Sequence, residues 1–141
     1  MNKPIITKRE GKPRKLTIHK KAIVYDDVQI DVSGRVNIEE GATLYYGVKI
    51  ITHKHHWSTK TRISEDNTIE RVDLTIGRDS FIGLDALILA VESIGEGAII
   101  GARAVVTKNI PPFEVWAGNP ARKIGERKDV QEEGETRNNI E

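Results

Sequence analysis

Three of the four histidines in the chain lie within one short segment, GVKIITHKHHW, as His53, His55 and His56. A neutral imidazole with a pKa of about 6.5 accepts a proton from a hydroxyl or an amine near neutral pH. In an extended backbone His53 and His55 point to the same side, whereas His56 points to the other. The cluster therefore indicates a general base, although histidines at the mouth of a solvated polar loop would give the same pattern.

Composition excludes several other chemistries for this chain of 141 residues. It has no cysteine, which excludes disulfides, thiolate zinc sites and thiol nucleophiles and favours a reducing, cytoplasmic setting. With 22 Lys and Arg against 21 Asp and Glu, the net charge of +1 argues against bulk nucleic-acid binding. We expect neither a cleaved signal peptide nor a membrane span.

The elements that position the histidines follow from aliphatic residues that recur every six positions. The most regular run consists of Ile76, Ile82, Ile88, Ile94, Ile100 and Val106. Glycine directly follows four of these residues, and a small residue stands four positions after four of them. A period of six fits neither an α-helix nor one long strand. It predicts short strands joined at corners, with three units forming one triangular coil.

A weaker form of the same period covers the first third of the chain. It includes Ile18, Val24 and Ile30 and, after an offset of two residues, Val32, Ile38, Leu44 and Ile50. The offset predicts a bulge or an enlarged corner. After Ile50 the period disappears, and we expect a polar loop over about residues 54–75 to leave one corner of the stack. A loop of this length in a regular stack is more often functional than accidental.

These patterns divide the chain into four parts. Residues 1–17 form a basic N-terminal segment, and residues 18–112 form the repeat domain, which ends where Pro111 and Pro112 remove two ladder donors. Residues 113–125 are predicted to fold back on the stack as a closing segment. Residues 126–141 carry many charges without apolar periodicity, so this tail is either a frayed helix or disordered.

The stretches IGRDSFIGLDALIL and SIGEGAIIGARAVVTKNIPPFEVWAGNPARKI resemble the hexapeptide-repeat acyltransferases, in particular the maltose and galactoside O-acetyltransferase type. With the earlier repeats, the resemblance covers residues 18–124. It implies an all-β fold, a left-handed parallel β-helix; the left hand comes from the family alone, because crossovers are generally right-handed. It also implies a homotrimer that binds an acyl-CoA, most often acetyl-CoA, between neighbouring β-helices.

The resemblance gives the histidine cluster a specific role. The catalytic base of maltose-type enzymes falls five residues after the inward aliphatic Ile50, on His55, and His53 is the second candidate. Backbone N–H groups of the adjoining coil would stabilise the oxyanion. Zinc-dependent γ-class carbonic anhydrases share the architecture, but their histidine spacing is missing here, so no metal is expected.

Residues for the acyl-CoA also follow from the resemblance. The positions that match the family are Ala102, Thr107, Lys108 and Arg122, and Gly101 directly precedes the first of them. Small residues allow the pantetheine arm to approach the backbone. The charges of Lys108 and Arg122 suit the phosphates, although either residue could be an ordinary exposed cation. Gly125 stands where relatives carry a second arginine, which leaves Lys123 to compensate.

Two further residues are candidates for the acceptor side. Phe81 matches an aromatic that borders the acceptor pocket in relatives, although it could simply pack at a corner. Glu92 stands where the repeat normally has an apolar residue, so its carboxylate must reach solvent, pair with a cation or contact a site group.

The short basic N-terminus lacks the helical segment that helps to form the sugar pocket of maltose-type enzymes. The acceptor is therefore not expected to be maltose or a galactoside, and bacterial surface-polysaccharide acetyltransferases are the closer analogy. The sequence predicts transfer of an acetyl group from acetyl-CoA to a hydroxyl of a sugar or glycan precursor. N-acetylation of an amino sugar and a non-catalytic β-helix scaffold are the alternatives.

Overall fold

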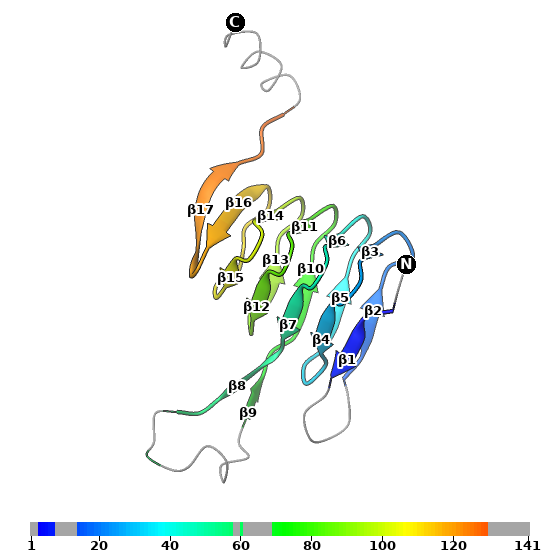
Figure 1. Cartoon of the computed structure of the whole chain (residues 1–141), viewed down its shortest axis with the longest axis vertical. Coiled ribbons are helices and arrows are strands. Elements are labelled where there is room, and N and C mark those ends of the chain that lie inside the picture. The colour runs from blue at the N-terminus through cyan, green and yellow to red at the C-terminus, as the bar shows by residue number, and fades with distance from the viewer. Residues whose placement is uncertain (1–2, 8–13, 58–59, 61–68, 130–141) are drawn as a thin grey trace, which may run out of the picture.

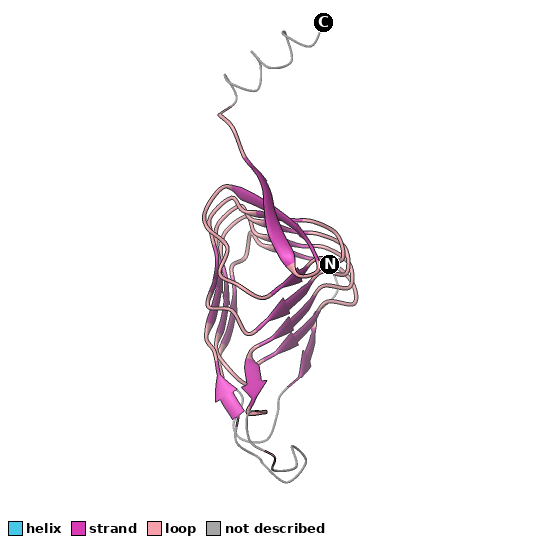
Figure 2. Ribbon diagram, turned by 90° about the vertical axis from the view of Figure 1, so that its left-hand side faces the viewer, coloured by secondary structure: helices cyan, strands magenta, loops and turns pink. Residues whose placement is uncertain are grey.

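The computed structural model of the chain describes residues 3–7, 14–57, 60 and 69–129, and all of its regular elements are strands. Fifteen of the seventeen strands form three sheets, which are the three sides of a triangular stack (Figure 1 and Figure 2). Within these three sheets, neighbouring strands are parallel except the last two strands, at the C-terminal end. The repeat therefore builds a parallel β-helix, as the period of six predicts.

The three sides are named here sheets A, B and C. Sheet A contains β1 (Ile5–Thr7), β4 (Gln29–Asp31), β7 (Lys49–Ile51), β12 (Leu87–Leu89) and β15 (Val105–Val106). Sheet B contains β2 (Leu16–Ile18), β5 (Val36–Ile38), β10 (Leu74–Ile76) and β13 (Ser93–Ile94). Sheet C contains β3 (Ile23–Val24), β6 (Thr43–Leu44), β11 (Phe81–Ile82), β14 (Ile99–Ile100), β16 (Glu114–Gly118) and β17 (Ala121–Glu126).

The aliphatic residues of the repeat fill the interior. On sheet A, Ile30, Ile50, Ile88 and Val106 lie in register on successive strands, and each has at most 1% of its surface exposed. Burying such a side chain contributes about 1.5–3 kcal/mol relative to leaving it in water. Small residues complete the core at the crowded corners, as at Ala86 and Ala104, which are fully buried.

Glycine after the aliphatic residue allows successive coils to touch. A Cβ atom added to Gly83 would lie 2.7 Å from the backbone nitrogen of Ala102 in the next coil. That distance is shorter than real Cβ contacts, so a side chain at this position would push two coils apart.

The β-helix begins before the predicted boundary at residue 18. Strand β1 pairs with β4, and β2 pairs with β5, so residues 5–7 and 16–18 already belong to the first coil. The predicted N-terminal segment 1–17 therefore overlaps the stack. Its two short aliphatic runs are separated by basic residues, which hides the repeat in the sequence.

The excursion after Ile50 begins as a β-hairpin. Strands β8 (His53–His55) and β9 (Ile69–Arg71) are antiparallel and project from the stack (Figure 1). Val72 and Leu74 are buried again, so the coil resumes a few residues earlier than the predicted loop end at residue 75. Residues 58–59 and 61–68 of the predicted loop lie outside the described residues.

The chain closes the stack with two longer strands. Strand β16 pairs in parallel with β14, and β17 returns antiparallel to β16. These strands correspond to the predicted closing segment 113–125 and extend it by one residue. Most of the predicted charged tail, residues 130–141, lies outside the described part of the chain.

Candidate functional site

The predicted histidines lie where the chain passes from sheet A to sheet B, a position named here the AB corner. Successive coils contribute residues 31–35, 52–57, 69–73, 90–92 and 107–109 to this corner. The hairpin β8–β9 leaves the stack at the same place (Figure 2). Segments that are far apart in the sequence therefore meet around the histidines.

A buried carboxylate lies at the base of the hairpin. Asp31 has 3% of its surface exposed and accepts hydrogen bonds from Ser33 Oγ at 2.8 Å and from the backbone nitrogen of Thr52 at 2.9 Å. The hydroxyl of Thr52 donates to the backbone oxygen of Asp31 at 2.8 Å and accepts from the nitrogen of Gly34 at 2.9 Å. The two-residue offset after Ile30 therefore corresponds to an enlarged corner, in which the side chains of Asp31, Ser33 and Thr52 are hydrogen-bonded to one another or to the backbone.

His53 joins the same cluster through its ring. Its Nδ1 atom lies 2.6 Å from Oδ2 of Asp31. Burial raises the pKa of Asp31, but hydrogen bonds from the Thr52 nitrogen, His53 and Ser33 outweigh burial and hold this pKa below its usual value. An ionised carboxylate only accepts hydrogen bonds, so the Nδ1 atom of His53 carries the proton. This hydrogen bond fixes the orientation of the ring and turns Nε2 away from Asp31.

His55 lies beside His53 and lines a cleft of about 700 Å³. The two imidazole centroids are 5.3 Å apart, with the rings nearly perpendicular. Leu89, Ala90 and Thr107 from two later coils form the opposite part of the lining. The cleft has the size of a small-molecule site and contains a titratable histidine.

A smaller hollow of about 350 Å³ adjoins this cleft and shares Ala90 and Thr107 with it. Lys108 and Glu92 both line the smaller hollow. Glu92 is exposed and Val91 takes the buried position, so the carboxylate reaches solvent. The side chain of Asn109 accepts hydrogen bonds from the backbone nitrogens of Glu92 and Ser93 at 2.8 and 3.3 Å, which fixes this corner.

The predicted CoA residues separate into two groups. Thr107 and Lys108 lie at the AB corner, whereas Gly101 and Ala102 lie at the other end of β15, where sheet C meets sheet A. The nitrogen of Gly101 donates to the oxygen of Trp116 in β16 at 2.8 Å. The structure therefore does not gather these residues in one pocket, but it places them at the two ends of β15.

Arg122 and Lys123 lie on the last strand, β17, opposite Ala117 and Trp116 of β16. Lys123 Nζ lies 3.5 Å from Glu114 Oε2 and also forms an ion pair with Glu126. The hydrogen bond to Glu126, together with the charge of Glu114, raises the pKa of Lys123. Lys123 thus already has two carboxylate partners, which weakens its case as a replacement for the missing phosphate-binding arginine.

Phe81 is not part of the cleft. It lies on sheet C with 39% of its surface exposed, and its ring centroid is 5.8 Å from that of Tyr45. Sheet C is the side of the triangle opposite the AB corner. A single chain therefore does not bring Phe81 to the histidines.

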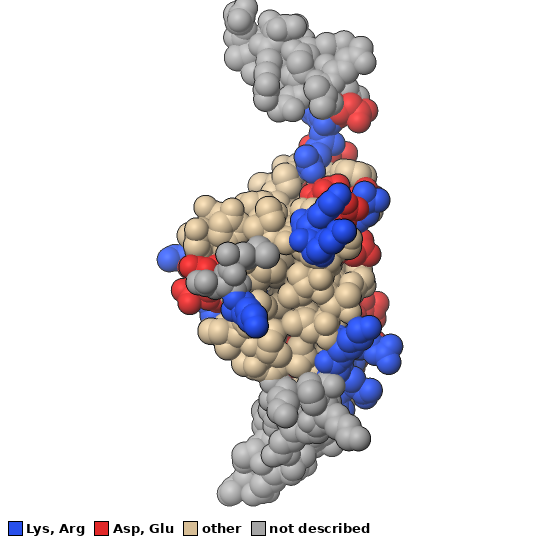
Figure 3. Space-filling model, turned by 90° about the vertical axis from the view of Figure 1, so that its right-hand side faces the viewer, with Lys and Arg blue, Asp and Glu red and all other residues tan. Residues whose placement is uncertain are grey.

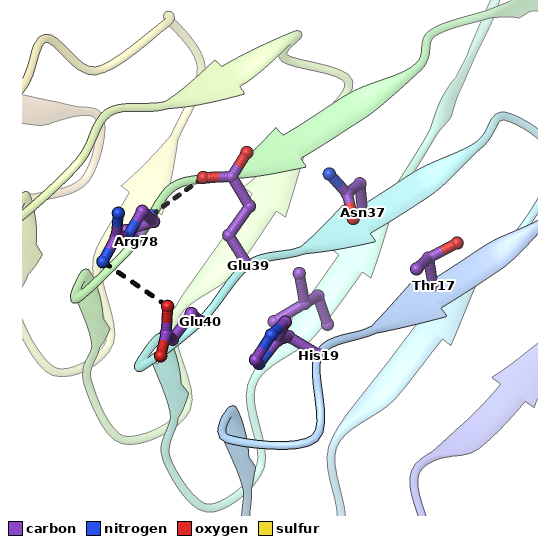
Figure 4. A pocket seen from close by; sticks show the side chains of 7 residues that line it. Thr17, His19, Asn37, Glu39, Glu40 and Arg78 are labelled. Carbon is purple, nitrogen blue, oxygen red and sulfur yellow. Dashed lines mark hydrogen bonds and ion pairs between the residues drawn. The ribbon is translucent and has the colours of Figure 1, made fainter.

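A separate hollow of about 390 Å³ lies outside sheet B and contains His19 (Figure 4). Its charged groups contact one another: Arg78 Nη2 lies 3.4 Å from Glu40 Oε2, and the nitrogen of Arg78 donates to Glu39 Oε2 at 3.2 Å. None of the residues that the sequence singles out as a site lies in this hollow.

Sequence reasoning missed Asp31, Thr52 and Ser33. The offset after Ile30 was the available signal, because it placed an extra Asp and Ser at the corner next to the histidine segment.

In the part of the chain that the structure describes, no three His, Cys, Asp or Glu side chains are grouped to hold a metal ion. No helix among the described residues is long and apolar enough to cross a membrane.

The sequence is similar to those of several acetyltransferases. A chloramphenicol acetyltransferase of Agrobacterium fabrum is 46% identical over 57 residues, which are 40% of this chain and 27% of that protein. WcaF of Escherichia coli, assigned to colanic acid biosynthesis as an acetyltransferase, is 30% identical over 119 residues, which are 84% of this chain and 63% of that protein. The chain thus spans about a quarter to somewhat under two thirds of these relatives. No protein-family model matches it.

Solved structures share the fold. The hexapeptide-repeat acetyltransferase VCA0836 of Vibrio cholerae aligns with a TM-score of 0.65 at 20% identity, over 82% of this chain and 74% of that chain. AntD, an N-acyltransferase of Bacillus cereus, aligns with a TM-score of 0.58 at 17% identity, over 96% of this chain and 90% of that chain. A galactoside acetyltransferase in complex with coenzyme A aligns with a TM-score of 0.53 at 30% identity, over 79% of this chain and 52% of that chain.

These similarities agree with the triangular stack, the register of its strands and the aliphatic repeat that fills it. The predicted all-β, left-handed parallel β-helix is confirmed. In its fold and its repeat sequence, this chain resembles the hexapeptide-repeat acetyltransferases.

Proposed function

We propose that this chain is a CoA-dependent acetyltransferase that moves an acetyl group from acetyl-CoA to a hydroxyl of a sugar or glycan precursor. The observation that carries the proposal is the cleft at the AB corner, where His55 and Thr107 line one space of about 700 Å³. Both curated relatives named above are acetyltransferases, and the galactoside acetyltransferase structure holds coenzyme A.

His55 acts as the general base in this proposal. Its imidazole takes the proton of the acceptor hydroxyl while the hydroxyl oxygen bonds to the thioester carbonyl carbon. Backbone N–H groups of the adjoining coil stabilise the negative oxygen that forms. The C–S bond then breaks, and the leaving thiolate takes the proton back from the imidazolium. The products are an acetyl ester and the CoA thiol, without a covalent enzyme intermediate.

His53 and Asp31 support this base. The hydrogen bond of 2.6 Å to Asp31 holds the ring of His53, and that ring packs edge-on against His55. His53 is the alternative base, because a histidine oriented by a carboxylate has the arrangement of an activated imidazole. His55 is preferred because it lines the cleft, whereas His53 faces Asp31 in an earlier coil.

The donor would lie along β15. Gly101 and Ala102 lie in the turn that leads into β15, and Thr107 directly follows the last residue of this strand, Val106. An extended pantetheine arm along this strand would contact Gly101 and Ala102 at one end and Thr107 at the other. Lys108 lies at the AB corner and Arg122 on sheet C, so these cations can serve the phosphates of one CoA only from two neighbouring copies of the chain.

Phe81 belongs to the acceptor site only if a second copy supplies it, because it lies on the side opposite the histidines. We therefore place the cleft between the subunits of a homotrimer. A cytoplasmic location fits a chain without cysteine.

A second candidate is N-acetylation of an amino sugar. AntD, an N-acyltransferase, shares the fold, and the same base would serve an amine acceptor. A non-catalytic scaffold is the remaining alternative, and it predicts no donor binding.

Thermal unfolding with acetyl-CoA, zinc or a chelator tests the proposal. A ligand present at 100 times its Kd stabilises the native state by about 2.7 kcal/mol, so saturating acetyl-CoA should raise Tm by several degrees, while zinc and chelator leave it unchanged. A thiol-release assay against sugars, nucleotide sugars and amino sugars then identifies the acceptor. Failure of acetyl-CoA to bind would favour the scaffold.

A further inference from the structure

Another hollow lies on the N-terminal side of the hairpin, and it is lined by charged residues. Arg14, Arg35, Arg71 and Asp73 surround a space of about 420 Å³. Among the described residues that line it, three guanidinium groups stand against one carboxylate, a formal charge of +2. Figure 3 looks at the N-terminal end of the stack and shows Lys and Arg side chains gathered low on that face.

The fold holds the backbones of these arginines in place. The nitrogen of Arg14 donates to the oxygen of Val32 at 3.0 Å, and the nitrogen of Arg35 donates to Asp73 Oδ1 at 2.8 Å. Arg71 lies in β9, directly across the hairpin from His53. Three segments, separated by about 20 and about 36 residues, therefore present arginine at one place.

Gly34 makes this convergence possible. A Cβ atom added to Gly34 would lie 1.9 Å from the backbone oxygen of Val72. Only glycine allows the enlarged corner of the second coil to press against the returning end of the hairpin. Arg35 and Arg71, the neighbours of these two residues, are thereby brought to the same side.

The histidine pair lies between this hollow and the cleft. His53 pairs with Arg71 across the hairpin and contacts Asp31 of the earlier coil, whereas His55 lines the cleft with Thr107 of a later coil. In the proposed function the donor lies along the later coils. The acceptor then approaches the histidines from the earlier coils, past the three arginines.

We propose that this arginine hollow is an anion subsite that binds a carboxylate or phosphate carried by the sugar acceptor. The guanidinium group is planar, remains charged and forms paired hydrogen bonds with both kinds of oxyanion. A hollow of about 420 Å³ is large enough for a group of this size. This inference rests on the proposed function, because it assigns the subsite to the acceptor of that reaction.

The experiment titrates three sugars into protein saturated with CoA, so that phosphates cannot enter the donor site. Glucuronic acid carries the carboxylate, glucose 6-phosphate carries the phosphate, and glucose is the neutral control. Binding is measured by calorimetry or by saturation-transfer NMR for the wild type and for an Arg35→Gln/Arg71→Gln variant. Arg78→Gln, an exposed arginine at the corner between sheets B and C, is the matched control. Arg14→Gln gives a milder variant if the double variant unfolds.

We expect at least one anionic sugar to bind about tenfold or more tightly than glucose to the wild type and the control. The double variant should lose this preference, and raised salt should weaken it. The two anionic arms show whether a carboxylate or a phosphate is preferred. Equal binding of all three sugars, or a preference that survives in the double variant, would overturn the subsite. A separate acetyl-CoA titration reports on the proposed function, which fails if the wild type does not bind the donor.

Discussion

Asp31 is the residue with the most polar contacts in the site, and its charge has a consequence for stability. The carboxylate is buried and accepts hydrogen bonds from Ser33, Thr52 and His53. Its pKa is lower in the folded chain than in the unfolded chain, where it is about 3.9. The stabilisation from Asp31 is therefore fully present well above pH 4 and is lost as the pH falls through the folded pKa.

Replacing Asp31 by Asn should destabilise the fold, because an amide nitrogen cannot accept the bonds that the second carboxylate oxygen accepts. Hydrogen bonds to a charged group contribute about 1.5–3 kcal/mol, and we expect a loss of that order at pH 7. Urea unfolding at pH 7 and at about pH 3 measures it. The difference between wild type and variant should shrink at the lower pH, and a difference independent of pH would contradict the ionised state of Asp31.

A substitution of Lys108 tests whether this side chain binds acetyl-CoA. Lys108→Ala should raise the KM for acetyl-CoA about tenfold or more and leave that for the acceptor nearly unchanged, since a charged hydrogen bond contributes about 1.5–3 kcal/mol. Steady-state kinetics with each substrate varied in turn measure both constants. Equal affinity of the wild type for acetyl-CoA and its 3′-dephospho form would show that no side chain reads the 3′-phosphate.

Among the elements, the enlarged AB corner and the hairpin depend on one close contact. Gly34→Ala would place a Cβ atom 1.9 Å from the backbone oxygen of Val72, so the hairpin must shift. Overpacking of this kind costs about 1–3 kcal/mol in the free energy of unfolding. Gly125→Ala is the control, because an added Cβ there has no atom within 4 Å, and we expect a change within about 0.5 kcal/mol. Chemical denaturation of both variants gives the comparison, and equal stabilities would contradict the role of Gly34.

Sequence periodicity predicts most of these elements, because each aliphatic of the repeat fills one layer of the same core. It misses β1 and the first two residues of β2, because the aliphatic residues at Ile5 and Leu16 lie among basic residues, and it recognises only Ile18, the last residue of β2. It also misses the Asp31 cluster, since Asp31 and His53 are 22 residues apart and meet only when two coils stack. The histidine segment itself is visible because three histidines interrupt an otherwise apolar repeat.

The whole molecule exposes a row of apolar side chains on and beside sheet C. Ile23, Tyr46, Phe81 and Leu84 are each 39–43% exposed. Exposed apolar patches mark interaction surfaces, and Phe81 reaches a histidine cleft only through another copy. We expect a mass of about three times 15.8 kDa by light scattering at micromolar concentration. A mass near that of one chain would count against both the trimer and the shared site.

The most direct test of the whole account is the turnover of His55→Ala. A general base contributes about 10² to 10⁴ in rate, so this variant should lose turnover by that factor while it still binds acetyl-CoA. His53→Ala should lose only about tenfold, because His53 orients His55 without taking the proton itself. Near-normal turnover of His55→Ala, with His53→Ala inactive, would move the base to His53. Activity retained in both variants would contradict the histidine mechanism itself.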